Sequence, residues 1–294
     1  MAVLIDGKAV AAELRAQLRE AVQQLWQERG IRPGLALLLV GDNPASQVYV
    51  RSKARACQEV GFVSIVEHLP ATSSQDHVLD YIRRWNADPA IHGILVQLPL
   101  PRHIDEHAVL LAIDPRKDVD GFHPENMGRL VLGLPGFVPC TPAGILELLR
   151  RYVGPLAGKH VVVVGRSNIV GKPVANLLLQ KTPTANAVVT VCHTGAADLV
   201  PFTRQADVLI VAMGVARAIR AEHVKEGAVV IDVGINRIVD PETGKERLVG
   251  DVHFEEVLPK VSAITPVPGG VGPMTIAMLL WNTYRAATGQ IWNR

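Results

Sequence analysis

The chain has 294 residues, of which 48% are hydrophobic and 20% are charged. Its formal net charge of +2 gives no reason to expect nucleic acid or an anionic membrane as a partner. The three cysteines show no paired spacing, and no apolar run approaches the ~20 residues that cross a bilayer. We therefore expect a cytoplasmic globular protein without a disulfide framework, a metal site or a membrane span.

The first half of the chain alternates short β-branched runs with helical stretches, a pattern typical of α/β folds with parallel sheets. Apolar side chains at helical spacing predict a helix over residues 8–29. The elements expected after it are strands at 35–40, 63–69 and 91–97 and helices at 44–59, 75–85 and 105–112. Residues 114–139 are interpreted as a long irregular segment, which in compact domains is often functional.

Two of these helices carry clear start signals. Asn43 is the predicted N-cap of the second helix, with Pro44 in the first helical position and Gly61 ending the helix. Residues 73–76 resemble a capping box in which aspartate replaces glutamate, and they predict the start of the third helix.

After a helix expected over 141–152, the alternation of strands and helices begins again. The predicted strands lie at 161–164, 187–192, 207–212 and 228–233, and the predicted helices at 172–180, at 197–205 with an interruption at Pro201, and from 273 to the end. One apolar face of the last helix is expected to pack on the first domain: Met274, Ala277, Met278 and Trp281.

The alternation predicts an α/β protein of two domains. The first is an N-terminal α/β domain formed by residues 1–140 and closed by residues 273–294. The second, residues 141–272, is expected to be a Rossmann-like, doubly wound dinucleotide-binding domain.

A candidate dinucleotide site follows the strand at 161–164. Gly165 and Gly171 flank a turn that leads into a helix, and free N–H groups at a helix N-terminus attract a pyrophosphate. The spacing differs from G-x-G-x-x-G, so an ordinary strand–turn–helix remains the alternative.

The residues around this turn favour NADP over NAD. The next strand ends at Cys192-His193-Thr194 without the acidic residue that usually binds the NAD ribose, while Arg166 offers a guanidinium to a ribose phosphate. His193 is either a further phosphate contact or a surface histidine. Ile235 either contacts the nicotinamide or packs within its loop.

A candidate chemical site combines helix and strand-end residues. Tyr49 and Lys53 are four residues apart on one helix face, which suits a stacking platform beside a proton-transfer group. Gln97 ends a predicted strand, and Asp120 lies in the following irregular segment. The alternatives are a solvated helix face and a turn aspartate.

A glycine-rich turn at 265–275 follows another expected strand and indicates backbone brought close to a ligand, although a simple tight turn is equally compatible. Leu98-Pro99 and Val267-Pro268 are candidates for cis peptide bonds.

Six motifs, in order along nearly the whole chain, resemble the bifunctional methylenetetrahydrofolate dehydrogenase/methenyltetrahydrofolate cyclohydrolase family. They lie at 40–53, 97–101, 117–121, 139–142, 165–173 and 266–275. The resemblance implies NADP-dependent oxidation of methylene-tetrahydrofolate and hydrolysis of the methenyl product to formyl-tetrahydrofolate. It also implies a homodimer that binds tetrahydrofolate derivatives between its two domains.

The resemblance also implies roles for individual residues. Lys53 would be the key catalytic residue, Gln97 would hydrogen-bond it, Tyr49 would stack on the aminobenzoyl group, and Asp120 would bind the pterin. The implied folate-binding set is Tyr49, Lys53, Val96, Gln97, Leu98, Asp120, Pro268, Gly269 and Gly270. The implied NADP-binding set is Gly165, Arg166, Ser167, Gly171, Thr194 and Ile235.

Two segments depart from the family's pattern. Ala196 stands where many relatives have a threonine, which removes one expected phosphate contact, and residues 214–217 replace a more usual Gly-Lys-Pro near the cofactor.

Three other functions remain open: a dehydrogenase-only member of the family, a related two-domain dehydrogenase for another small substrate, and a non-catalytic NADP sensor.

Overall fold

The computed structural model describes residues 2–239 and 244–291. The chain divides into two compact units. The three-stranded unit comprises residues 12–140 and 276–294, and the six-stranded unit comprises residues 1–11 and 141–275. Each unit contains a parallel sheet covered by helices, so the predicted α/β class is confirmed.

The sheet of the three-stranded unit has β2 (Gly34–Val40) at its centre, with β3 (Val63–Leu69) and β4 (Gly93–Val96) parallel on either side. β4 is shorter than the strand predicted over 91–97 and stops before Gln97. Every residue of β2 is buried, because helices cover both faces of the sheet.

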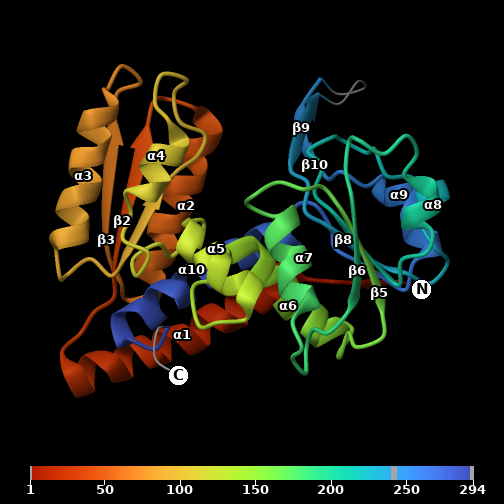
Figure 1. The fold of residues 1–294 in the computed structure, drawn as a ribbon, viewed down its shortest axis with the longest axis horizontal. Helices are drawn as coiled ribbons and strands as arrows, with labels where there is room; N and C mark the ends of the chain where they lie inside the picture. Colours follow the sequence, from red (N-terminus) through yellow and green to blue (C-terminus); the bar gives the residue numbers. More distant parts are fainter. Residues whose placement is uncertain (1, 240–243, 292–294) are drawn as a thin grey trace. The chain divides into compact units, whose positions relative to one another are not determined.

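Alternate residues of β2 belong to two different hydrophobic clusters. Leu35, Leu37 and Leu39 pack with α1 (Gly7–Arg29), α2 (Pro44–Val60) and α10 (Val271–Thr288). Ala36, Leu38 and Val40 pack with α3 (Gln75–Ala87) and α4 (Glu106–Leu111). Figure 1 shows α2 and α3 on opposite sides of this sheet.

The segment predicted to be irregular over 114–139 contains a helix, which corrects that prediction. α5 (Pro124–Leu132) begins after His123, whose Nδ1 accepts the Glu125 amide at 3.1 Å. It ends at Gly133, which has a φ of 66°. Proline at the first helical position and glycine after the last are ordinary end signals. The density of turn-forming residues around them obscured this short helix.

In the six-stranded unit the strand order is β1-β11-β8-β7-β5-β6, and all neighbours are parallel. The strands are β1 (Val3–Leu4), β5 (His160–Val164), β6 (Val188–Cys192), β7 (Val208–Val211), β8 (Val229–Asp232) and β11 (Ala263–Ile264). A separate antiparallel pair, which we did not predict, is formed by β9 (Asn236–Val239) and β10 (Glu246–Val249).

The helices of the six-stranded unit range in length from four to 13 residues. They are α6 (Cys140–Tyr152), α7 (Gly171–Leu179), α8 (Val200–Thr203), α9 (Phe254–Val257) and the 3-10 turns at Ala221–His223 and Leu258–Lys260. The helix predicted over 197–205 is reduced to α8, and Pro201 lies at its start rather than interrupting it. Proline is compatible with a helix start because its missing N–H has no helical partner there.

The apolar face of α10 is shared between the units, whereas we expected all of it to pack on the first domain. Met278 and Trp281 pack against the cluster around Leu37 in the three-stranded unit. Met274 lies within the six-stranded unit, where a Cβ placed on Gly144 would be 2.7 Å from the Met274 Cβ. The division falls after Thr275, partway along the helix.

No helix among the described residues is long and apolar enough to cross a membrane.

Candidate functional site

Lys53 and Gln97 form a direct contact in the three-stranded unit. The ammonium Nζ of Lys53 donates to Gln97 Oε1 at 3.1 Å. The amide nitrogen of Gln97 donates to the carbonyl oxygen of Leu98 at 2.7 Å, which fixes the amide oxygen toward Lys53. Both side chains are half-buried. The structure thus brings together two residues that are 44 positions apart in the chain.

The position of Lys53 depends on the start of α2. Asn43 Oδ1 accepts the amides of Ala45 and Ser46 at 3.0 and 3.1 Å, as its predicted N-cap role requires. Gly61 ends the helix with a φ of 82°. Because both ends of α2 are fixed, the helical turn that carries Lys53 is held where its amine reaches Gln97, directly after β4.

Asp120 lies near Lys53 and beside Cys140. Burial raises the pKa of the Asp120 carboxyl, and the positive charge of Lys53 opposes that rise. Burial, followed by the charge of Asp120, raises the pKa of the Cys140 thiol well above its usual range. The Cys140 thiol is therefore neutral and not a nucleophile, and its hydrogen is donated to Val119 O at 3.3 Å.

Tyr49, Val96 and Leu98, which also belong to the predicted folate set, lie in the same unit as Lys53. Tyr49, one helical turn before Lys53, is 41% exposed and presents its ring at the surface of α2. Val96 is buried in β4, and Leu98 follows the strand with a cis bond to Pro99.

The glycine-rich turn belongs to the six-stranded unit. Val267-Pro268 is cis, and Gly269 has a φ of 109°, a conformation that side chains other than glycine rarely adopt. A Cβ on Gly270 would be 2.7 Å from Pro266 O, so a side chain has no room there either. The turn is further held by the Lys8 amide, which donates to Gly269 O at 2.9 Å.

The turn after β5 needs its two glycines for close backbone packing. Gly165 has a φ of 127°, and a Cβ there would be 2.1 Å from Ala212 O. A Cβ on Gly171 would be 2.2 Å from Gly165 O. The two glycines therefore let the first turn of α7 lie directly against the end of β5.

The helix start offers fewer free amides than the sequence led us to expect. Ser167 Oγ accepts the amides of Val170 and Gly171 at 3.1 and 3.4 Å. Because these donors are already engaged, an anion at this turn depends more on side chains than on the backbone of α7.

A pocket of about 250 Å³ lies beside this turn. Four of the six predicted NADP contacts line it: Gly165, Arg166, Ser167 and Thr194. Gly171 lies beneath Gly165 and does not line it, and neither does Ile235, whose Cδ1 would be 3.6 Å from a Cβ on Gly272. The remaining lining residues include His193, Leu199 and Met213.

His193 and Arg166 present two hydrogen-bond donors at this pocket. His193 Nδ1 accepts the Gly195 amide at 3.0 Å, so we assign the hydrogen of the neutral ring to Nε2. Nε2 is 3.4 Å from Arg166 Nη1, which is also a donor. Two donors cannot satisfy each other, so both are available to a negatively charged acceptor.

Two buried aspartates organise the loops near the pocket. Asp251 Oδ2 accepts the amides of Met213 and Gly214 at 2.7 and 2.8 Å, which fixes the loop after β7. Asp232, at the end of β8, accepts the amides of Gly234, Asp251 and Val252. Burial raises the pKa of the Asp232 carboxyl to about 6 despite these hydrogen bonds.

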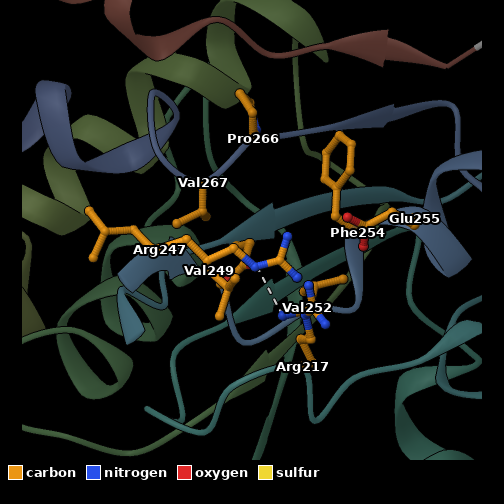
Figure 2. Close-up of a pocket in the computed structure, with 11 residues that line it drawn as sticks. Arg217, Arg247, Val249, Val252, Phe254, Glu255, Pro266 and Val267 are labelled. Carbon is orange, nitrogen blue, oxygen red and sulfur yellow. Dashed lines mark hydrogen bonds between the residues drawn. The ribbon is translucent and has the colours of Figure 1, made fainter. Parts of the chain in front are cut away.

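A separate cavity of about 190 Å³ lies over the hairpin of β9 and β10 (Figure 2). It contains none of the predicted site residues. Arg217 and Arg247 face it together with Asp232 and Glu255, so positive and negative groups balance within its lining. The balance of charge gives this cavity no preference for an ionic ligand.

Sequence reasoning gave no role to Cys140, Asp251 or Asn282, although all three are buried. Cys140 lies in one of the six motifs, and Asp251 follows a short strand. Their neighbours are distant in the chain, so spacing alone gave no signal.

Among the described residues, no group of three or more His, Cys, Asp or Glu side chains is placed to hold a metal.

Two family models match the chain and together cover most of it. Residues 5–120 match the tetrahydrofolate dehydrogenase/cyclohydrolase catalytic domain, and residues 139–291 match the NAD(P)-binding domain of the same family. The bifunctional protein FolD of Chlorobium phaeovibrioides is 60% identical over 284 residues, which are 96% of each chain.

Solved structures give the same result. The bifunctional FolD methylenetetrahydrofolate dehydrogenase/cyclohydrolase of Campylobacter jejuni is 53% identical, with a TM-score of 0.92 over 99% of this chain and 100% of that one. The dehydrogenase–cyclohydrolase of Trypanosoma brucei, solved with NADP and an inhibitor, is 41% identical, with a TM-score of 0.92 over 99% of each chain.

Proposed function

The chain belongs to the tetrahydrofolate dehydrogenase/cyclohydrolase family, and from this we propose how its own residues carry out the two reactions. The first is the NADP-dependent oxidation of methylene-tetrahydrofolate to methenyl-tetrahydrofolate, and the second is the hydrolysis of that product to formyl-tetrahydrofolate. The contact between Lys53 and Gln97, with Asp120 nearby, is the observation that supports this function most strongly.

The pocket beside Gly165 fits a dinucleotide with a ribose phosphate. Arg166 and His193 supply donors for the phosphate, and Ser167 and Thr194 add hydroxyl groups. Gly165 and Gly171 allow close approach of the backbone. Ile235 does not line this pocket and stays a predicted apolar contact of the nicotinamide end of the cofactor. NADP, when bound, accepts the hydride from the methylene carbon. The protein's part in that step is to hold and orient the two reactants.

The folate is held by residues of complementary chemistry. Tyr49 stacks on its aminobenzoyl ring, since an exposed aromatic ring offers a flat apolar surface. The Asp120 carboxylate binds the amino-pyrimidine edge of the pterin, which presents N–H donors. The backbone at Val96 and Leu98 and the Pro268–Gly270 turn complete the predicted folate contacts.

Hydrolysis depends on Lys53. Water adds to the methenyl carbon and a C–O bond forms. One C–N bond then breaks: the departing folate nitrogen takes up a proton, and the new hydroxyl group loses its proton as it becomes the formyl carbonyl. The base form of Lys53 accepts the proton that water loses. Gln97 contributes a neutral acceptor to the amine, so it orients Lys53 without the added negative charge that would favour the ammonium form.

We further propose that the three-stranded unit carries the catalytic group of Lys53, Gln97 and Asp120 and that the six-stranded unit carries the NADP contacts. The predicted domains 1–140 with 273–294 and 141–272 would carry these two groups, respectively. In this proposal the first eleven residues belong with the NADP-binding unit, because β1 pairs with β11.

Cytoplasmic location is part of the same proposal, and the three cysteines, which are all free and buried, are compatible with it.

The predicted homodimer is supported by the edge of the larger sheet. Among the described residues β6 pairs only with β5, and Val188 and Val191 on β6 are 62% and 40% exposed. An unpaired apolar edge strand favours pairing with another chain. Sedimentation of the wild type and of V188K with V191K tests this: we expect a dimer and a monomer, and a monomeric wild type contradicts it.

An assay of the two reactions separately tests the function. With methylene-tetrahydrofolate we expect reduction of NADP at a higher kcat/KM than of NAD, followed by accelerated loss of the methenyl absorbance. A dehydrogenase without effect on added methenyl-tetrahydrofolate identifies the dehydrogenase-only alternative. Absence of turnover with either cofactor contradicts the proposed function.

A further inference from the structure

Asn282, on α10, connects two segments of the three-stranded unit that lie next to the predicted pterin-binding carboxylate. Its amide nitrogen donates to Val119 O at 2.9 Å and to Val138 O at 3.0 Å. Val119 directly precedes Asp120, and Val138 lies two residues before Cys140. The Asn282 side chain thus holds two backbone segments, the one that carries Asp120 and the one that carries Cys140.

The two segments are packed so closely that a shift of one must displace the other. Gly121 has a φ of 76°, and a Cβ there would be 2.7 Å from the Pro139 nitrogen. Cys140 Sγ donates to Val119 O at 3.3 Å and is also 3.8 Å from the Asn282 amide nitrogen. The backbone on both sides of Asp120 therefore has few positions available to it.

The environment of Asn282 makes its two hydrogen bonds important. The side chain is 3% exposed, and its neighbours Leu279 and Leu280 on α10 are fully buried in the apolar core. A buried carbonyl that loses its donor has no water to replace it, which destabilises the backbone conformation that holds it there. An apolar residue at 282 would remove the bonds that tie both carbonyls to α10: Val119 O would keep the weak Cys140 thiol donor at 3.3 Å, and Val138 O would lose its bond to Asn282.

We propose that Asn282 is a positioning residue for folate binding: it fixes the segments at Val119–Gly121 and Val138–Cys140 to each other, so that the Asp120 carboxylate is presented in one orientation. This inference rests on the proposed binding of the pterin by Asp120. Asn282 does not touch the substrate, and its effect is therefore on the affinity for folate rather than on the affinity for NADP.

The test compares N282L with T283V. Thr283 is a buried neighbour whose hydroxyl donates to Leu279 O at 2.9 Å, so T283V removes a buried hydrogen bond whose two partners both lie within α10. We expect N282L to raise the KM for methylene-tetrahydrofolate about tenfold, the effect of roughly one lost hydrogen bond. The KM for NADP should change by less than about twofold, because the substitution lies outside the NADP-binding residues. T283V should lower the melting temperature but leave both KM values near those of the wild type.

Two further variants separate the possible failures. N282S retains one donor and should give an intermediate KM for folate, which keeps the test valid if N282L does not fold. D120N should raise the same KM strongly. If D120N raises it and neither Asn282 variant does, Asn282 is not a positioning residue, while the proposed function stands. If D120N leaves the KM unchanged, the role of Asp120 is wrong, and the inference about Asn282 is lost with it.

Discussion

The amide of Gln97 orients the Lys53 side chain through a neutral acceptor. Its nitrogen is engaged by Leu98 O at 2.7 Å, so its oxygen faces the Lys53 amine at 3.1 Å. A neutral oxygen orients the amine and leaves it able to lose its proton, whereas a carboxylate at this position would hold the proton. The choice of an amide over a carboxylate is therefore chemically significant.

We predict that Q97E impairs hydrolysis much more than substrate binding. The added negative charge favours the ammonium form of Lys53, so the base form is reached only at higher pH. Methenyl-tetrahydrofolate hydrolysis should fall at least about tenfold at neutral pH, because a smaller fraction of Lys53 is then in the base form, and it should recover as the pH rises. The pH profile of the rate is the measurement. Q47E places the same charge on a more N-terminal turn of α2 and should leave the profile unchanged; an unshifted profile for Q97E contradicts the role of Gln97.

His193 lets the preference for NADP be tested within one variant. If its Nε2 hydrogen and Arg166 bind the ribose phosphate together, H193A should raise the KM for NADP about tenfold, as expected for one charge-assisted hydrogen bond. The KM for NAD, which lacks that phosphate, should stay nearly constant and serves as the internal control. Equal losses for the two cofactors would place His193 outside the phosphate site.

Among the elements, the loops at the carboxyl ends of β7 and β8 are held by Asp251 and Asp232 rather than by regular secondary structure. Burial raises the pKa of Asp232 to about 6, above the 3.8 of an unperturbed aspartate. The folded protein therefore binds a proton more tightly at Asp232 than the unfolded chain does. This contribution to stability is present at low pH and is lost as the pH rises through about 6.

We predict that D232N removes this pH dependence. Between about pH 4 and pH 6 the wild type should lose part of its stability advantage over D232N as the pH increases, because only the wild type has a proton to lose there. Urea unfolding of both proteins across this range gives the difference in unfolding free energy. A difference that grows with pH would mean that the three amide hydrogen bonds outweigh burial.

Elements with strong local signals could be predicted, and those without them could not. The start of α2 is determined locally, because the cap atom of Asn43 and its acceptor amides lie within three residues. The next helix shows the limit: we expected a capping box over 73–76, but Ser74 is the N-cap and its hydroxyl accepts the His77 amide. Adjacent serines are chemically equivalent in sequence, and only the packed structure selects one of them.

Across the chain as a whole, the alternation of strands and helices predicted two parallel sheets but not the strand order. β1 is two residues long and pairs with β11, more than 250 positions later, so local propensity carries no trace of that pairing. The same applies to the site. The pair of Lys53 and Gln97 was expected from strand-end geometry and the family resemblance, whereas the contacts of Cys140 and Asn282 depend on chain segments that meet only after folding.

Only one of the two reactions, the hydrolysis, uses Lys53 for proton transfer. The role of Lys53 can therefore be tested directly. Proton transfer from water requires the Lys53 amine, whereas hydride transfer requires mainly that the reactants be held in place. A matched comparison is available on α2, where Arg55 is an exposed cation two residues further along.

The decisive measurement is the rate at which K53M hydrolyses methenyl-tetrahydrofolate, with folate binding followed in parallel and R55M as the control. We predict that hydrolysis falls by about 100-fold or more, the usual contribution of a general base, while the folate still binds and R55M behaves as the wild type. Hydrolysis by K53M at the wild-type rate would contradict the assignment of Lys53 as the catalytic residue.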